Sequence, residues 1–202
     1  LVDVGSLEAL RILSSASAVI AEGEVMQLGA AQDLGTSEER YMQVIEAKTA
    51  ALFAAAAEVG PVIADAGEAD RAGARDYGMA LGLAFQLVDD ALDYGGSAAD
   101  LGKDTGDDLR EGKITLPVIL AIARGREENR AFWQRCLEAR DVRDGDLETA
   151  ITIMHETDAL ADTVVRARSF GEEALTALEK LPAGPQRDAM AEAVEFCIAR
   201  VK

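Results

Sequence analysis

Three aspartates, Asp89, Asp90 and Asp93, stand close together near the end of an apolar stretch. On a helix, Asp89 and Asp93 lie one turn apart on the same face, and Asp90 lies about 100° round from Asp89. Like charges this close destabilise a helix unless cations or lysines neutralise them. Mg²⁺ typically takes one or two carboxylates and completes its shell with water and phosphate. The triplet therefore predicts a Mg²⁺ site that accepts a phosphorylated ligand, with a solvated acidic helix end as the plainer alternative.

Two lysines, Lys103 and Lys113, follow in a segment rich in glycine and aspartate. Their ammonium groups are placed to reach the phosphates of a ligand held at the aspartates, although a plain surface loop has the same composition. Asp108 lies in an acidic cluster between them, and we expect it to hold a lysine or a metal-bound water. The segment predicts the positive charge that a diphosphate needs.

Polar side chains also interrupt two apolar stretches. Gln86 lies one helical turn before Asp89 and Asp90, so its side-chain amide projects toward the same ligand site as the aspartates. Lys48 and Thr49 lie within another helical segment and could place an ammonium group and a hydroxyl beside a diphosphate. A lysine can also simply extend its ammonium group from an apolar face into water.

The composition favours one helical domain over residues 1–202. Hydrophobic residues make up 49% of the chain and aromatic residues only 4%, and there are four prolines. The formal charge of −17 argues against nucleic-acid binding, which usually needs a basic face. The two cysteines lack metal-ligand spacing and read as reduced thiols of a cytoplasmic protein. No apolar run reaches the roughly 18 residues of a membrane span.

Apolar residues at helical spacing, together with capping signals, predict an all-α chain with no strand pattern. A capping pattern at Thr36–Glu39 and Gly60-Pro61 bound the second helix. The glycines of the third helix, Gly73, Gly78 and Gly82, suggest close approach to neighbouring helices. We read residues 95–114 as a loop. The expected helices span residues 6–32, 36–59, 68–94, 115–125, 127–140, 146–156, 158–181 and 185–201.

In order and spacing, these motifs resemble the C-terminal portion of the trans-polyprenyl diphosphate synthases. The likeness covers nearly the whole chain and is nearest to the bacterial octaprenyl and decaprenyl synthases, which make quinone side chains. It implies an isoprenoid synthase-type helical bundle around a central apolar cavity, usually a homodimer. The segments that carry it are Glu22-Gly23-Glu24, Gln27-Leu28, Lys48-Thr49-Ala50, 85–93, Gly102-Lys103 and 106–117.

In that family an allylic diphosphate ionises with the help of Mg²⁺, and its carbocation alkylates isopentenyl diphosphate. The resemblance assigns metal binding to Asp89, Asp90 and Asp93, and binding of the allylic diphosphate to Lys48, Lys103 and Lys113. It assigns stabilisation of the cation to Thr49 and Gln86, and contact with isopentenyl diphosphate to Phe85. Because the product of such an enzyme is hydrophobic, the resemblance also allows peripheral contact of the protein with a membrane.

One departure from the family pattern affects the expected activity. The first aspartate-rich motif and the basic residues around it are absent from the 202 residues, so we expect a fragment whose N-terminal helices are missing and which is inactive alone. A non-catalytic subunit of a heteromeric prenyltransferase is one alternative. A class I terpene cyclase, with the same fold and metal chemistry, is another, although Lys48-Thr49 and the lysine-bearing segment favour chain elongation.

Overall fold

The computed structural model describes residues 4–95 and 105–201. Within these ranges the chain is helical and has no β-strand, which confirms the predicted all-α class. The helices are α1 (Leu7–Ala30), α2 (Glu38–Ile45), α3 (Ala51–Ile63), α4 (Glu68–Gly95), α6 (Asp107–Glu111), α7 (Leu116–Arg124), α8 (Glu127–Trp133), α9 (Asp146–Glu156), α10 (Ala159–Leu178) and α11 (Pro185–Ala199). Two π-helical turns join neighbours: Glu46–Ala50 links α2 to α3, and Gln134–Glu138 continues α8.

Serine caps begin the first two helices. The Ser6 hydroxyl accepts a hydrogen bond from the backbone N–H of Ala9, and that of Ser37 accepts one from Arg40, each at 3.2 Å. Each cap satisfies one N–H that has no partner inside its helix. The capping pattern at Thr36–Glu39 therefore marks a real helix start, with Ser37 as the capping residue.

Two predicted boundaries were wrong. Gly60-Pro61 does not end the second helix, because α3 continues to Ile63 with Pro61 in its last turn. A proline there forfeits only one hydrogen bond, and Gly60 has no Cβ to clash with the proline ring. The predicted loop at 95–114 contains α6, a helix of five residues between the left-handed Gly106 and Gly112, too short for periodicity to reveal.

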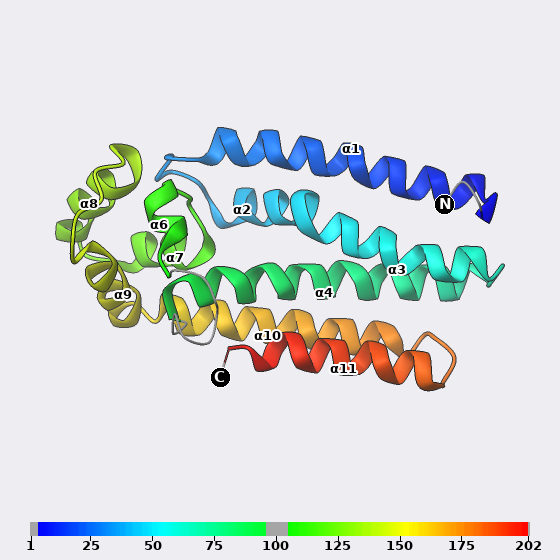
Figure 1. The fold of residues 1–202 in the computed structure, drawn as a ribbon. Helices are drawn as coiled ribbons and strands as arrows, with labels where there is room; N and C mark the ends of the chain where they lie inside the picture. The colour runs from blue at the N-terminus through cyan, green and yellow to red at the C-terminus, as the bar shows by residue number, and fades with distance from the viewer. Residues whose placement is uncertain (1–3, 96–104, 202) are drawn as a thin grey trace.

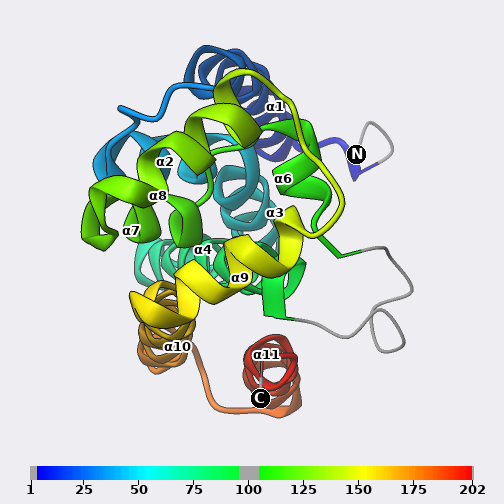
Figure 2. The same cartoon turned by 90° about the vertical axis from the view of Figure 1, so that its left-hand side faces the viewer.

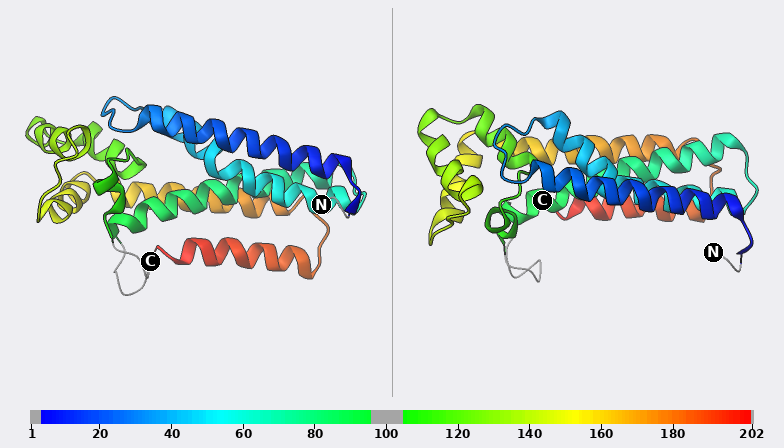
Figure 3. Two further views of the ribbon diagram at one scale, coloured as in Figure 1. Left: turned by 45° about the horizontal axis from the view of Figure 1, so that its top comes forward. Right: turned by 90° about the horizontal axis from the view of Figure 1, so that it is seen from above.

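The long helices lie side by side and alternate in direction, with the chain turning back at each connection (Figure 1). Helix α4 packs against α3 and against α10. The short helices α6–α9 cover one end of the bundle, and the views from that end and from above agree on this placement (Figures 2 and 3). Because α1, α4 and α11 run toward this end, their C-terminal turns lie there together.

Close backbone approach explains two glycines of α4, as the spacing suggested. A Cβ added at Gly78 would lie 2.3 Å from the carbonyl oxygen of Phe53. One added at Gly82 would lie 2.6 Å from the Cα of Ala50. The contact holds α4 against the start of α3, next to the π-helical turn that carries Lys48 and Thr49.

None of the helices in the described ranges has both the length and the apolar character of a membrane-spanning segment. The two cysteines, Cys136 and Cys197, are buried free thiols.

Candidate active site

A pocket of about 200 Å³ opens at the end of the bundle where the last turns of α1 and α4 meet α2 and the π-helical turn that follows it. Acidic and basic side chains face each other across it. Its charged and amide-bearing wall residues are Gln27, Lys48, Gln86, Asp89, Asp90, Asp108 and Lys113. The pocket thus joins residues from segments far apart in the sequence.

Asp90 lies at the buried side of this pocket with only 4% of its surface exposed. One carboxylate oxygen accepts a hydrogen bond from the Tyr41 hydroxyl at 2.5 Å, and the other accepts one from the Gln86 side-chain amide at 2.8 Å. Burial raises the pKa of the Asp90 carboxyl to about 7, a rise that the hydrogen bond from Tyr41 limits. The carboxylate is held in one orientation, and a nearby cation would favour its charged form.

Thr49 extends this group of hydrogen bonds. Its hydroxyl donates to the amide oxygen of Gln86 at 2.8 Å, and the Gln86 nitrogen points to Asp90. The structure therefore joins Thr49, Gln86 and Asp90, which sequence reasoning had placed near one ligand. Thr49 itself does not line the pocket.

The three aspartates occupy the last turns of α4, where the helix dipole is negative and acids are disfavoured. For Asp93, hydrogen bonds to α6 offset this unfavourable interaction. Its two carboxylate oxygens accept hydrogen bonds from the backbone N–H groups of Asp107 and Asp108, each at 3.1 Å. Burial and the neighbouring Asp108 raise the pKa of the Asp93 carboxyl to about 6. Asp93 does not line the pocket wall, unlike Asp89 and Asp90.

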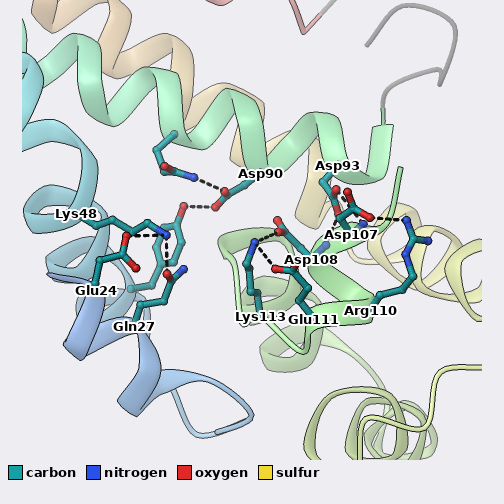
Figure 4. A network of polar contacts seen from close by, with 12 residues as sticks. Glu24, Gln27, Lys48, Asp90, Asp93, Asp107, Asp108, Arg110, Glu111 and Lys113 are labelled. Atoms are coloured by element: carbon teal, nitrogen blue, oxygen red, sulfur yellow. Dashed lines mark hydrogen bonds and ion pairs between the residues drawn. The ribbon is translucent and has the colours of Figure 1, made fainter. Parts of the chain in front are cut away.

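Lys113 projects into the pocket from the segment after α6 (Figure 4). Its ammonium group lies 2.9 Å from a carboxylate oxygen of Asp108 and 2.8 Å from one of Glu111. Asp108 thus holds a lysine, one of the two roles expected for it. The close-up shows a continuous connection from Asp93 through α6 to Lys113.

Lys48 lies on the π-helical turn, and its ammonium group donates to the side-chain oxygen of Gln27 at 2.6 Å. Glu24 forms a second, longer contact with it at 3.4 Å. Both partners come from α1 (Figure 4). π-Helical turns are rare and often mark functional positions. Here the turn presents Lys48 to the pocket rather than leaving it in solvent.

Asp89 and Phe85 share a partner that sequence reasoning missed, Arg200 after α11. The Arg200 guanidinium lies 3.7 Å from an Asp89 oxygen, and its Cζ lies 5.5 Å from the centre of the Phe85 ring. Phe85 also packs against Phe53 at 5.4 Å between ring centres. Lys103 lies outside the described residues, so its assignment stays a prediction.

Tyr41 is the other residue that the sequence did not indicate. It lies on α2 and is buried, with 5% exposed. The capping pattern located the start of its helix, yet nothing local shows which hydroxyl faces Asp90. Gln27 was noted only within a family-like motif, and its contact with Lys48 gives it a place in the site.

An apolar groove of about 820 Å³ begins one helical turn beyond Thr49. It lies between α3, α4 and α11 and is far more spacious than the charged pocket. Among its wall residues are Leu52, Phe53, Ala57, Pro61, Leu181 and Met190. The small alanines of α3 leave this space open, which suits a hydrocarbon chain.

The donors at the charged pocket fit Mg²⁺. Among the described residues, no three acidic, histidine or cysteine side chains gather as a cluster that could hold a metal ion. Mg²⁺ does not require such a cluster, because it takes few carboxylates and fills its remaining positions with water and phosphate oxygens. Asp89, whose side chain is 47% exposed, and Asp90 offer carboxylate oxygens at the pocket wall, facing two lysines.

Comparison with known proteins places this arrangement in a family. Residues 1–154 match the family model described as polyprenyl synthetase. The chain belongs to the polyprenyl synthetase family. The octaprenyl diphosphate synthase of Escherichia coli K12 is 41% identical over 197 residues, covering 98% of this chain and 61% of that protein. The all-trans-nonaprenyl-diphosphate synthase of Rhodobacter capsulatus is 38% identical, covering 100% and 61%.

Solved structures of polyprenyl synthases share the fold. A decaprenyl diphosphate synthase from Rhodobacter capsulatus is 50% identical with a TM-score of 0.93, covering 100% of this chain and 62% of that one. A polyprenyl synthase from Caulobacter crescentus, complexed with calcium and isoprenyl diphosphate, is 46% identical with a TM-score of 0.94, covering 100% and 61%. The chain therefore spans about three fifths of the length of these relatives.

Proposed function

We propose that the chain supplies the second aspartate-rich half of a Mg²⁺-dependent trans-polyprenyl diphosphate synthase. Such an enzyme condenses isopentenyl diphosphate with an allylic diphosphate to build a long trans chain, the precursor of a quinone side chain. The observation that carries the proposal is the pocket in which Asp89 and Asp90 face Lys48 and Lys113. The high identity to octaprenyl and decaprenyl synthases supports the long-chain product.

Each charged residue of the pocket has a proposed role in binding the metal or the diphosphate. Mg²⁺, when bound, neutralises the diphosphate and helps it leave; Asp89 and Asp90 would hold it, with Asp93 as the third proposed ligand. The calcium and isoprenyl diphosphate of the Caulobacter relative support a divalent cation and a diphosphate here. Lys48 and Lys113, with Lys103 as a further proposed contact, bind the allylic diphosphate and compensate the negative charge of the chain.

The reaction breaks the allylic C–O bond, releases diphosphate, forms a C–C bond to isopentenyl diphosphate and loses a proton. The oxygens of Thr49 and Gln86 would face the developing cation, and fixed dipoles stabilise such charge best where water is excluded. Phe85 would contact isopentenyl diphosphate. The apolar groove beside α3 would take the growing hydrocarbon.

A homodimer and a cytoplasmic location are also part of this proposal. Leu7, Leu10, Val25 and Leu28 form one stripe along α1, and their exposed fractions run from 41% to 82%. α1 lies at the edge of the bundle, where a second copy would cover the stripe. Leu28→Glu should then convert a dimer to a monomer in analytical ultracentrifugation. Buried free thiols are typical of a reducing compartment.

The deciding experiment is turnover of labelled isopentenyl diphosphate with farnesyl diphosphate and Mg²⁺, with the products sized after dephosphorylation. We would test the 202-residue chain alone and fused behind the N-terminal part of the Escherichia coli octaprenyl diphosphate synthase. We expect a long linear polyprenol from the fusion and little or none from the chain alone. A cyclised product would instead identify a terpene cyclase. Activity restored only by a separate partner protein would identify a heteromeric subunit.

A further inference from the structure

Tyr41 and Asp90 form a buried contact between α2 and α4. Their side chains come from positions 49 residues apart, and the hydroxyl oxygen lies 2.5 Å from the carboxylate oxygen. Both residues are almost fully buried, at 5% and 4% exposed. A buried carboxylate is costly unless hydrogen bonds compensate it, so this contact is worth more than a surface one.

The second carboxylate oxygen of Asp90 ends a chain of hydrogen bonds that runs from Thr49 through Gln86. Gln86 donates to it through its amide nitrogen, which leaves the amide oxygen to accept from Thr49. The Tyr41 hydroxyl reaches Asp90 from α2, whereas the Gln86 amide lies on α4 itself, one turn before Asp90. Since each oxygen has its own donor, the carboxylate cannot rotate without losing a hydrogen bond.

We propose that Tyr41 is a positioning residue: it fixes the Asp90 carboxylate and, through Gln86, fixes the direction of the Thr49 hydroxyl. Without the Tyr41 hydroxyl, one oxygen of Asp90 has no donor, and the carboxylate is free to rotate away from this fixed orientation. Gln86 then loses its fixed acceptor and its amide can flip. The catalytic consequence rests on the proposed function, whereas the positioning itself does not.

Tyr77 provides the comparison that separates positioning from simple packing. It is as buried as Tyr41, with 6% exposed, and its hydroxyl also makes one hydrogen bond, to the backbone carbonyl of Met190 at 2.9 Å. Replacing either tyrosine with phenylalanine removes one buried hydroxyl and one bond. Only Tyr41→Phe removes a bond to a carboxylate at the charged pocket.

The experiment is NMR of the full 202-residue chain with ¹⁵N-labelled glutamine side chains, with Gln86 assigned from Gln86→Glu. In Tyr41→Phe the Gln86 amide signals should shift, and their exchange with water should quicken about tenfold or more. In Tyr77→Phe they should stay as in the unsubstituted chain. An unchanged Gln86 signal in Tyr41→Phe, or an equal change in both variants, overturns the proposal.

A second variant decides the matter if Tyr41→Phe fails to fold. With ¹³Cζ-labelled tyrosine, Asp90→Asn should shift the Tyr41 resonance and leave that of Tyr77 in place. Equal shifts, or none, would show that the Tyr41 hydroxyl does not depend on this carboxylate.

Turnover provides the readout of the catalytic consequence. In the active fusion, Tyr41→Phe should lower kcat about 10- to 100-fold, the usual cost of losing a partner behind a metal-binding side chain, with KM for isopentenyl diphosphate within about twofold. Thr163→Val removes another buried hydroxyl, one bonded to Ala159 on α10, and should leave kcat unchanged. An intact kcat in Tyr41→Phe overturns the catalytic part. An inactive parent fusion would refute the proposed function alone, since the NMR result still decides the positioning.

Discussion

Gly23 of α1 lies directly against the backbone of Lys48 on the π-helical turn. A Cβ at position 23 would lie 2.5 Å from the Lys48 nitrogen and 2.9 Å from the carbonyl carbon of Ala47. No real side chain fits at that distance. The same close approach brings Gln27, one turn further along α1, to the Lys48 ammonium group. The absence of a Cβ at Gly23 thus determines where the ammonium group of Lys48 lies.

Gly23→Ala should therefore destabilise the chain, although alanine is the better helix former by about 1 kcal/mol. Forcing atoms into a packed contact typically costs about 1–3 kcal/mol, and the net loss should appear as a lower midpoint in urea unfolding. Gly29→Ala, on the same helix with nothing within 4 Å, is the control and should stabilise the chain slightly. If the two variants gain stability equally, the contact is not a tight one.

Asp93 should prove necessary for the position of Lys113. In Asp93→Ala the N–H groups of Asp107 and Asp108 lose their acceptor, so α6 is no longer held to the end of α4. We expect faster hydrogen exchange over residues 105–113 by mass spectrometry and a loss of about 2 kcal/mol of unfolding free energy. Asp107→Ala, which keeps the Asp93 carboxylate, should leave the exchange of Lys113 unchanged. Equal exchange in Asp93→Ala and the parent would contradict this role.

Much of the fold was predictable because its long helices bury regular stripes. The spacing of apolar residues located α4 and α10, and the serine at position 37 marked a helix start. The helix end predicted at Pro61 was wrong, because the ability of a proline to end a helix depends on the residue before it and on its position in the helix. α6 is too short for periodicity; it is a helix because two left-handed glycines bound it and a distant carboxylate binds its first N–H groups.

The candidate site was only partly predictable for a similar reason. Side chains within one or two turns of each other, such as Gln86 and Asp90, can be joined by counting along a helix. Tyr41 and Arg200 reach the aspartates from other elements, and their partners depend on how whole helices pack. Local spacing also suggested that Asp89 and Asp93 share one ligand, whereas in the structure Asp93 contacts the backbone of α6.

The unfolding free energy should fall in acid through Asp146, the first residue of α9. Its carboxylate accepts two hydrogen bonds from the Arg135 guanidinium, at 2.7 and 2.8 Å, and one from the backbone N–H of Arg143 at 2.6 Å. The hydrogen bonds from Arg135 lower the pKa of Asp146 below its ordinary value of 3.8. The folded chain thus binds this proton more weakly than the unfolded chain, so the contribution is complete above about pH 4 and is lost as the pH falls further.

Asp146→Asn tests this pH dependence. The variant should be less stable than the parent at pH 7, because the partly exposed Arg135 guanidinium loses its charged partner. Its unfolding free energy should then change less than that of the parent between pH 5 and pH 3. Asp144→Asn, an exposed position on the same loop, should follow the parent throughout. Parallel pH profiles for Asp146→Asn and the parent would show that the pair does not contribute as stated.

Arg200 should compete with a cation for Asp89. Its guanidinium lies 3.7 Å from the Asp89 carboxylate, which is 47% exposed, and the contact is of the weak, solvent-screened kind. In Arg200→Gln this competitor is gone, so Mg²⁺ should bind about two- to fivefold more tightly, matching an ion pair of about 0.5–1 kcal/mol. Calorimetric titration of Mg²⁺ in the presence of inorganic diphosphate measures this. Arg124→Gln removes the same charge from a pair with Asp162 instead and should leave the affinity unchanged. Weaker binding in Arg200→Gln would mean that the arginine helps to hold the diphosphate rather than competing with the metal.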